Sequence, residues 1–170
     1  GDGVPDTLEP GGGVGAGPTK KDTDGDGLED AEELLPLEDG VITDPTVPDT
    51  DEDGLSDGLE KQLGTDPTKK DTDDDGLEDL VEDANADGVI GAEETDPNND
   101  DTDGDGIKDG DEDADHDGTV GAGETDPKSR DTDGDGMDDG WERTWSASGE
   151  GEGSPLDPTK KDHNADADGD

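Results

Sequence analysis

The sequence predicts an irregular rod of stacked repeats, made mostly of loops with short helical turns, with little or no β-sheet and no hydrophobic core. Three observations lead to this fold class. Hydrophobic residues make up only 20% of the 170 residues, and there is no Phe, Tyr or Cys. The formal net charge is -46. Acidic strings recur at short intervals, which is typical of an array in which each unit contacts its neighbours.

The composition also excludes several classes of function. So few apolar residues cannot offset the entropy of ordering the chain, and without cysteine no disulfide can substitute for a core. The negative charge repels nucleic acid and anionic membranes, and no apolar run reaches the roughly 18 residues of a membrane span. We therefore expect no nucleic-acid partner and no membrane insertion, and small cations as the natural ligands.

The acidic residues alternate in the pattern of a calcium loop. A 12-residue loop of this kind takes ligands from positions 1, 3, 5, 7 (a backbone carbonyl), 9 and 12, with Gly at position 6 and a bidentate Glu at position 12. Alternate residues of a tight loop point inward, so three carboxylates meet at one point and repel one another without a cation. Magnesium demands stricter octahedral geometry, and zinc prefers His or Cys. The pattern therefore predicts Ca²⁺.

Seven stretches fill this pattern, and each is named here by its first residue. Five principal loops have Asp at position 9. Their predicted ligands are Asp22, Asp24, Asp26, Leu28, Asp30 and Glu33; Asp49, Asp51, Asp53, Leu55, Asp57 and Glu60; Asp71, Asp73, Asp75, Leu77, Asp79 and Glu82; Asp101, Asp103, Asp105, Ile107, Asp109 and Glu112; and Asp131, Asp133, Asp135, Met137, Asp139 and Glu142.

Two second loops have Gly at position 9, where a water often serves as the ligand. Their predicted ligands are Asp83, Asn85, Asp87, Val89 and Glu94, and Asp113, Asp115, Asp117, Thr119 and Glu124. Seven complete loops predict at least seven calcium ions per chain.

The loops divide the chain into repeats, and each repeat after the first is preceded by a Thr-Asp-Pro or Asp-Pro-Thr marker. The predicted repeats span residues 22–48, 49–70, 71–100, 101–130 and 131–161; the two 30-residue repeats contain a pair of loops, and the last has a longer linker. We interpret residues 1–21 as the second half of a repeat begun before the chain start, and residues 162–170 as the first half of one continued in the next unit.

The two chain ends complete one loop when they are joined head to tail. Its ligands would be Asp168, Asp170, Asp2, Val4, Asp6 and Glu9. The expected partners are therefore copies of the same unit, either in a covalent tandem or as filament subunits that share a loop. The alternative is that the boundaries fell inside an ordinary repeat.

Residues 22–30 (DTDGDGLED) and 64–71 (GTDPTKKD) resemble prokaryotic thrombospondin type 3 repeats. The resemblance implies calcium-wrapped extracellular rods or spacers with little regular secondary structure. Animal members carry disulfides, so the similarity is to the cysteine-free microbial form. The Asp83 and Asp113 loops look more like EF-hand or dockerin half-motifs.

Short helical turns are expected after the loops, over residues 29–35, 56–63, 77–82 and 138–145, while residues 146–153 read as a loop. Six apolar residues in these turns are expected to pack between neighbouring repeats: Leu34, Leu35, Leu59, Leu63, Leu80 and Val81. Trp141 and Trp145 would share a helix face, either for local packing or for a contact between chains. His116 and His163 stand at non-ligand positions and are expected to be solvated.

The favoured function is a secreted structural one: a repeat unit of an extracellular microbial filament, or a rigid cell-surface spacer or adhesin stalk. The alternatives are a calcium-dependent, dockerin-like protein-interaction module and a calcium buffer. A sensor would need an apolar groove that the composition cannot supply. No enzyme and no small-molecule substrate are expected, because there is no nucleophile–base pair and the carboxylates are needed to saturate their ions.

Overall fold

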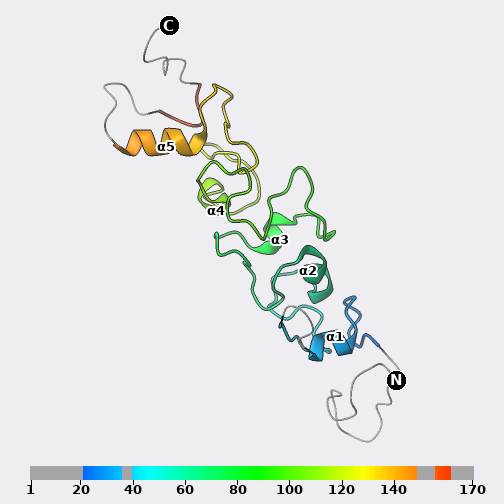
Figure 1. Ribbon diagram of the computed structural model, residues 1–170. Helices are drawn as coiled ribbons and strands as arrows, with labels where there is room; N and C mark the ends of the chain where they lie inside the picture. Colours follow the sequence, from blue (N-terminus) through cyan, green and yellow to red (C-terminus); the bar gives the residue numbers. More distant parts are fainter. Residues whose placement is uncertain (1–20, 36–39, 149–155, 162–170) are drawn as a thin grey trace, which may run out of the picture.

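The computed structural model describes residues 21–35, 40–148 and 156–161, and it is an elongated succession of loops and short helices (Figure 1). The helices are α1 (Asp30–Leu34), α2 (Asp57–Leu63), α3 (Asp79–Glu82), α4 (Asp109–Glu112) and α5 (Asp139–Ser148). No strand occurs within these ranges. The expectation of a mostly irregular chain with short helical turns is confirmed.

Each helix begins at position 9 of a principal loop, and α2 shows how such a short helix is closed. The hydroxyl of Ser56 accepts a hydrogen bond from the Leu59 N–H at 3.4 Å and caps the start of α2. Gly64 ends α2 in the left-handed region with φ of 86°, and its N–H donates to the Glu60 carbonyl at 2.7 Å. A residue without a Cβ adopts this terminating conformation at little cost.

Two helical predictions need correction. No turn was predicted at α4, whose Gly110 and Asp111 are poor helix formers. The turn forms because the N–H of Asp109 is held by the Asp100 carbonyl at 3.2 Å, a contact that every principal loop repeats. Residues 146–148, which the sequence assigned to a loop, belong to α5.

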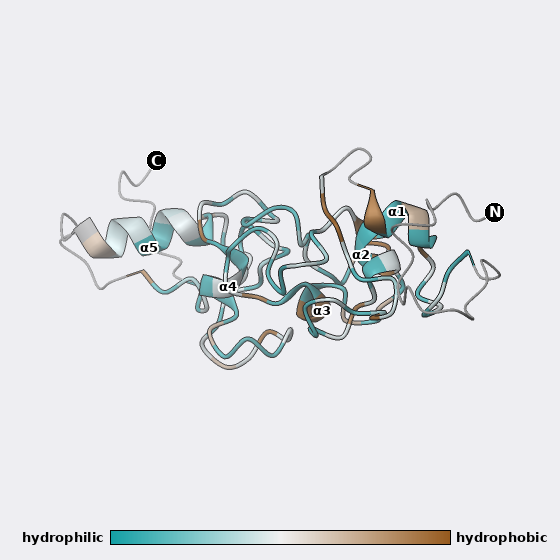
Figure 2. Ribbon diagram, turned by 90° about the horizontal axis from the view of Figure 1, so that it is seen from below, coloured by the Kyte–Doolittle hydropathy of each residue, from teal (hydrophilic) through white to brown (hydrophobic). Residues whose placement is uncertain are grey.

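The interior of the chain is mainly acidic. Among the described residues, the buried hydrophobic side chains are Leu55, Leu77 and Ile107, each at position 7 of a loop. The carboxylates at positions 9 and 12 are as deeply buried; Asp57, Glu60, Asp79, Asp109 and Asp139 are all 0% exposed. The ribbon is correspondingly hydrophilic along most of its length (Figure 2). Buried charge on this scale requires a compensating cation or proton.

Successive repeats approach so closely at position 10 that a side chain would not fit. A Cβ on Gly58 would lie 2.4 Å from the Asp26 carbonyl oxygen of the preceding repeat. Gly110 and Gly140 meet the carbonyls of Asp75 and Asp105 in the same way, at 2.6 and 2.3 Å. Glycine at position 10 therefore sets the spacing at three of the joints between repeats.

The joint between the Asp49 and Asp71 repeats is built differently. Position 10 of the Asp71 loop is Leu80, and its side chain lies 2.8 Å from where a Cβ on Gly54 would be. Leu59 likewise lies against Gly88 and Val81 against Gly118, which are glycines of the two second loops. These three apolar residues contact neighbouring repeats, as the sequence predicted.

Candidate metal centres

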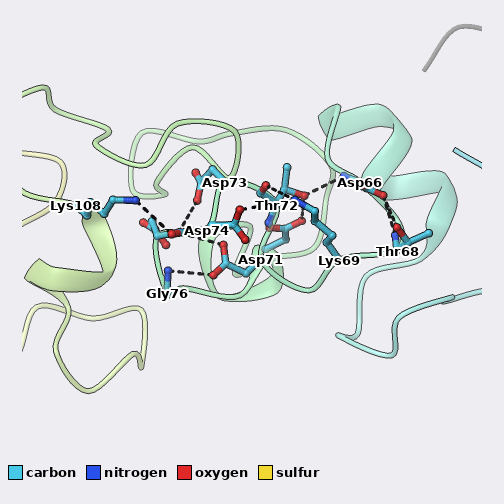
Figure 3. A network of polar contacts seen from close by, with 11 residues as sticks. Asp66, Thr68, Lys69, Asp71, Thr72, Asp73, Asp74, Gly76 and Lys108 are labelled. Atoms are coloured by element: carbon cyan, nitrogen blue, oxygen red, sulfur yellow. Dashed lines mark hydrogen bonds and ion pairs between the residues drawn. The ribbon is translucent and has the colours of Figure 1, made fainter. Parts of the chain in front are cut away.

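The first Asp of each principal loop closes the loop through backbone N–H groups. In the Asp71 loop, Asp71 Oδ1 accepts from the Asp75 N–H at 3.3 Å and Oδ2 accepts from the Gly76 N–H at 3.0 Å (Figure 3). Gly76 has φ of 111°, a conformation that favours glycine at position 6. The loop is thereby bent so that its alternate side chains converge.

Positions 3 and 5 each use one carboxylate oxygen for the loop. Asp73 Oδ1 accepts from the Asp75 N–H at 3.2 Å, and Asp75 Oδ1 accepts from the Leu77 N–H at 2.7 Å. The second oxygen at position 3 is buried and has no hydrogen-bond partner in any of the five principal loops: Asp24, Asp51, Asp73, Asp103 and Asp133. Five equivalent orphaned oxygens indicate one recurring ligand.

The Glu at position 12 completes each site from the following helix. Glu60 is 0% exposed, and neither of its carboxylate oxygens has a hydrogen-bond donor. Glu33 is 1% exposed, with Oε2 unpartnered and Oε1 accepting from the Thr43 hydroxyl at 3.3 Å. The Glu82 and Glu112 oxygens also lack a donor within bonding geometry. Burial raises the pKa of both carboxyls, and the nearby Thr95 and Thr125 hydroxyls oppose part of that rise.

Two kinds of carboxylate cluster result, with ligand atoms within 4.8 Å of one another. Clusters within a loop join positions 1, 3 and 5, as in Asp22, Asp24 and Asp26; Asp49, Asp51 and Asp53; and Asp71, Asp73 and Asp75. Clusters across a joint add position 12 of the same loop and position 9 of the next loop, as in Asp26, Glu33 and Asp57, and in Asp53, Glu60 and Asp79. The sequence assigned position 9 to its own loop, whereas here it also faces the preceding one.

The Asp at position 9 is fixed by the Thr at position 2 of its own loop. Asp79 accepts from the Thr72 N–H and from the Thr72 hydroxyl, both at 2.8 Å. The Thr72 hydroxyl accepts in turn from the Asp66 N–H of the Thr-Asp-Pro marker at 2.9 Å. The marker, the loop and the next helix are thus joined in one hydrogen-bonded chain (Figure 3).

The clustered carboxyls strongly resist ionisation without a cation. Burial, reinforced by Asp51 and Asp53, raises the pKa of Glu60 to about 9. Burial and the facing Asp residues likewise raise the pKa of Glu82 to about 9, and those of Glu33 and Glu112 to about 8. A divalent cation would remove the repulsion among these groups.

The donor set fits calcium. The clusters offer carboxylate oxygens and no His or Cys, the chemistry of a hard cation. The orphaned oxygens at positions 3 and 12 converge with the position-5 carboxylate from two segments of one repeat. Position 9 of the next repeat supplies a further oxygen, so these residues can supply the several oxygen ligands that calcium takes.

The two second loops keep the ligand pattern but differ in structure. Glu94 Oε1 accepts from the Asn85 side-chain amide at 2.8 Å, and Oε2 accepts from the Gly91 N–H at 2.7 Å. Glu124 accepts from the Gly121 and Asp115 N–H groups at 2.6 and 3.3 Å. Within the described part of the chain, no orphaned buried oxygen belongs to these loops.

Other predicted site residues fall into two groups. Every position-7 residue in the seven loops donates its N–H to the position-5 carboxylate, in a range of 2.7 to 3.0 Å: Leu28, Leu55, Leu77, Val89, Ile107, Thr119 and Met137. The loop predicted from the two chain ends, Asp168, Asp170, Asp2, Val4, Asp6 and Glu9, lies outside the described residues.

His116 is exposed, as expected of a solvated side chain, but it also makes a specific contact. Its Nε2 lies 3.1 Å from the Gly110 carbonyl oxygen. Its ring lies 3.5 Å from where a Cβ on Gly76 would be. The side chain therefore connects a second loop to the Asp71 loop. His163 is outside the described residues.

Comparison with protein families identifies these loops. The model of the bacterial TSP3 repeat matches residues 22–35, 49–70, 101–118 and 131–144. These four stretches are similar to the bacterial TSP3 repeat. The resemblance seen in the sequence is confirmed, and the TSP3 repeat implies a calcium-binding structural module rather than an enzyme family. Residues 71–82 are not among the matched stretches, yet their loop makes the same contacts as the TSP3 loops around it.

The other comparisons add no relative, since no curated protein and no solved structure matches the chain. In the described residues, no helix has the length and apolar character needed to cross a membrane. TSP3 repeats are typically extracellular.

Sequence reasoning missed three features of the TSP3 loops: the Thr at position 2, the Gly at position 10 and the basic residue that often precedes the loop. Each recurs in register with the loops and was therefore visible in the sequence. They were overlooked because the ligand pattern accounts only for residues that touch the ion.

Proposed function

We propose that the protein is a secreted, calcium-stiffened rod that serves as a filament unit or a rigid spacer at a microbial surface. The observation that carries the proposal is the cluster across each joint. Asp53, Glu60 and Asp79 come from two repeats, and Glu60 is fully buried without a donor. An ion at this point would fix one repeat against the next, so that stiffness is a direct product of calcium binding.

The extracellular setting suits this chemistry. Extracellular calcium modules bind in the range of about 10⁻⁴–10⁻³ M, which makes them saturated outside cells. A chain whose carboxylates repel one another stays unfolded until calcium is available, because metal binding supplies the folding free energy. A simple buffer would bind the same ions, but it would have no need of ligands shared between repeats.

Small-angle scattering with and without a chelator tests the proposal. The calcium-saturated chain should scatter as a thin rod, and the chelated chain should show the larger, more variable dimensions of an unfolded chain. Replacing calcium by magnesium at equal concentration is the control, since magnesium keeps its waters and demands octahedral geometry. A chelated chain that keeps the same rod profile and circular dichroism would refute calcium-dependent stiffness.

A second candidate function, binding of a partner protein, is favoured by one observation. Trp141 and Trp145 stack on the face of α5 with ring centroids 5.5 Å apart, and they are 47% and 42% exposed. Exposed paired indoles are typical of contact surfaces. They are the only aromatic residues, so intrinsic fluorescence would report on this surface alone. A spectrum unchanged by adding candidate surface proteins from the producing cell would count against this role.

A further inference from the structure

We propose that a basic side chain braces four of the joints between loops by binding the main-chain carbonyl at position 4 of the preceding loop. This brace lies outside the set of calcium ligands. The inference rests on the proposed rod function, because it explains part of the rod's stiffness. It adds to that function, because the residues concerned are not calcium ligands.

Lysines bind this carbonyl at two joints, and an arginine lies beside the same residue at a third. Lys70, directly before the Asp71 loop, donates from Nζ to the Glu52 carbonyl at position 4 of the Asp49 loop. Lys161 donates to the Gly134 carbonyl, at position 4 of the Asp131 loop, at 3.4 Å. The guanidinium of Arg130 lies against Gly104, at position 4 of the Asp101 loop, 3.9 Å from where a Cβ would be.

The fourth joint keeps the cation although its position in the sequence has changed. Asp100 precedes the Asp101 loop at the position where Lys21, Lys70 and Arg130 precede theirs. Lys108, at position 8, now pairs with Asp100 at 2.7 Å and donates to the Asp74 carbonyl, at position 4 of the Asp71 loop, at 3.3 Å (Figure 3). The acidic residue now precedes the loop and the basic residue stands at position 8, yet a basic side chain still binds the carbonyl at position 4.

Two other loops have the basic residue before the loop and the acidic residue at position 8, and there too the two side chains face each other. Arg130 bonds Asp138 at 2.7 Å, and Lys21 bonds Glu29 at 3.0 Å, in each case between the residue before the loop and position 8. The acceptor is equally regular. Position 4 is in the left-handed region in all four loops that receive a cation, with φ of 62° at Glu52, 61° at Asp74, 76° at Gly104 and 74° at Gly134.

One joint lacks the basic residue. Pro48 precedes the Asp49 loop, so the joint between the Asp22 and Asp49 repeats has no cation at that position. The backbone is nevertheless placed as elsewhere. The Pro48 carbonyl accepts from the Asp57 N–H at 3.1 Å, just as the Lys70 carbonyl accepts from the Asp79 N–H at 2.7 Å. The backbone would therefore place a lysine at residue 48 as it places Lys70. Because Pro48 stands there instead, we predict that the Asp22 and Asp49 repeats move more freely against each other.

Distances between spin labels in the full, calcium-saturated chain test the brace. The chain has no cysteine, so a pair of introduced cysteines is labelled cleanly. Exposed residues serve as label sites, with Lys61→Cys and Glu93→Cys across the joint that Lys70 braces, and Glu32→Cys and Lys61→Cys across the joint that carries Pro48. The width of each distance distribution measures how firmly the joint is held.

Lys70→Met should broaden the 61–93 distribution, and Pro48→Lys should narrow the 32–61 distribution. Lys69→Met is the matched control, because it removes the same charge while Lys69 contacts Thr72 and Asp74 of the loop that follows it, and not the preceding Asp49 loop that Lys70 contacts. High salt should shrink the difference between Lys70→Met and the unaltered chain.

Three outcomes would overturn the brace: equal widths for Lys70→Met and Lys69→Met, an unchanged 32–61 width in Pro48→Lys, or a loss of calcium ions in Lys70→Met. Calcium titration of the same samples distinguishes the two proposals. If the chain binds its ions and becomes rigid, but substitutions at residues 48 and 70 leave the distance distributions unchanged, the proposed function stands and the brace is refuted.

Discussion

The principal loops and the second loops have the same pattern of oxygen-bearing side chains at positions 1, 3, 5 and 12, all acidic except Asn85, yet they form different structures. Principal loops bury their carboxylates, leave oxygens without donors and lead into a helix. Second loops bury the Asp at position 1, leave the residues at positions 3 and 5 exposed, and satisfy the position-12 Glu with their own N–H and amide groups. The structural difference between the two kinds of loop correlates with the residues at positions 2 and 9, and not with those at positions 1, 3, 5 and 12.

Positions 2 and 9 separate the two kinds of loop. Every principal loop has Thr at position 2 and Asp at position 9, and the two bond each other, as in Thr50 and Asp57 at 2.7 Å. The second loops have Ala84 or Ala114 at position 2 and Gly91 or Gly121 at position 9. Without this pair the segment after the loop is not drawn toward the ion site. The pair is present or absent as a unit, and we therefore expect loop type to depend on it.

The largest difference is expected from the Glu at position 12. Glu60→Gln should weaken calcium binding at its joint about tenfold or more, since losing a contact to a charged group costs about 1.5–3 kcal/mol. Glu94→Gln should cost less, because the Glu94 oxygens are already bonded within their own loop. Calorimetric titration of both variants measures this, and equal losses would contradict the distinction between the two loop types.

A methyl group on a loop glycine should have a smaller effect that again differs between the loops. Gly58→Ala places a Cβ 2.4 Å from the Asp26 carbonyl, a backbone atom that cannot move aside, and should destabilise the calcium-bound chain by about 1–3 kcal/mol. In Gly91→Ala the Cβ meets Glu94 Oε2 at 2.8 Å, the end of a flexible side chain. Urea unfolding at saturating calcium measures the free energy of unfolding of both variants. A larger loss of stability in Gly91→Ala than in Gly58→Ala would contradict this prediction.

The pH dependence should follow the principal loops. The pKa of Glu60 in the folded, metal-free site is about 9, above its ordinary value of 4.5. The folded site therefore binds more protons than the unfolded chain between about pH 4.5 and 9, and metal-free compactness should decrease as pH rises through that window. Calcium must displace these protons, so binding at pH 7 should release them. Titration in buffers of different ionisation enthalpy counts the protons, and Glu60→Gln should lower the count.

The smallest effect concerns the pair that distinguishes the loops. Thr50→Val keeps the shape but removes the hydroxyl that donates to Asp57, which should cost about 1 kcal/mol. Thr46→Val is the matched control, because its hydroxyl bonds the exposed carboxylate of Asp44 at 2.7 Å. Thermal unfolding in calcium should separate the two variants, and identical midpoints would show that burial of the bond has no consequence.

The sequence predicted the chemistry of the site better than its connections. The alternating Asp residues and the Glu at position 12 were identified because ligand geometry fixes their spacing along the chain. The role of Asp57 and Asp79 toward the preceding repeat was not predicted, because it depends on how far one repeat is rotated against the next. That rotation is set by backbone contacts such as the one between Gly58 and Asp26, which leave no acidic signature. The turn at α4 was missed for the same reason, since a tertiary contact overrides poor helix propensity there.

The clusters shared across joints have a consequence for how order spreads along the chain. Since Glu60 and Asp79 belong to different repeats, the joint site exists only when both repeats are folded, and filling it favours the next repeat in turn. Folding on calcium should therefore propagate like a zipper, with binding that is steeper than that of an isolated loop. A short drop in calcium would open a run of consecutive repeats rather than scattered single sites.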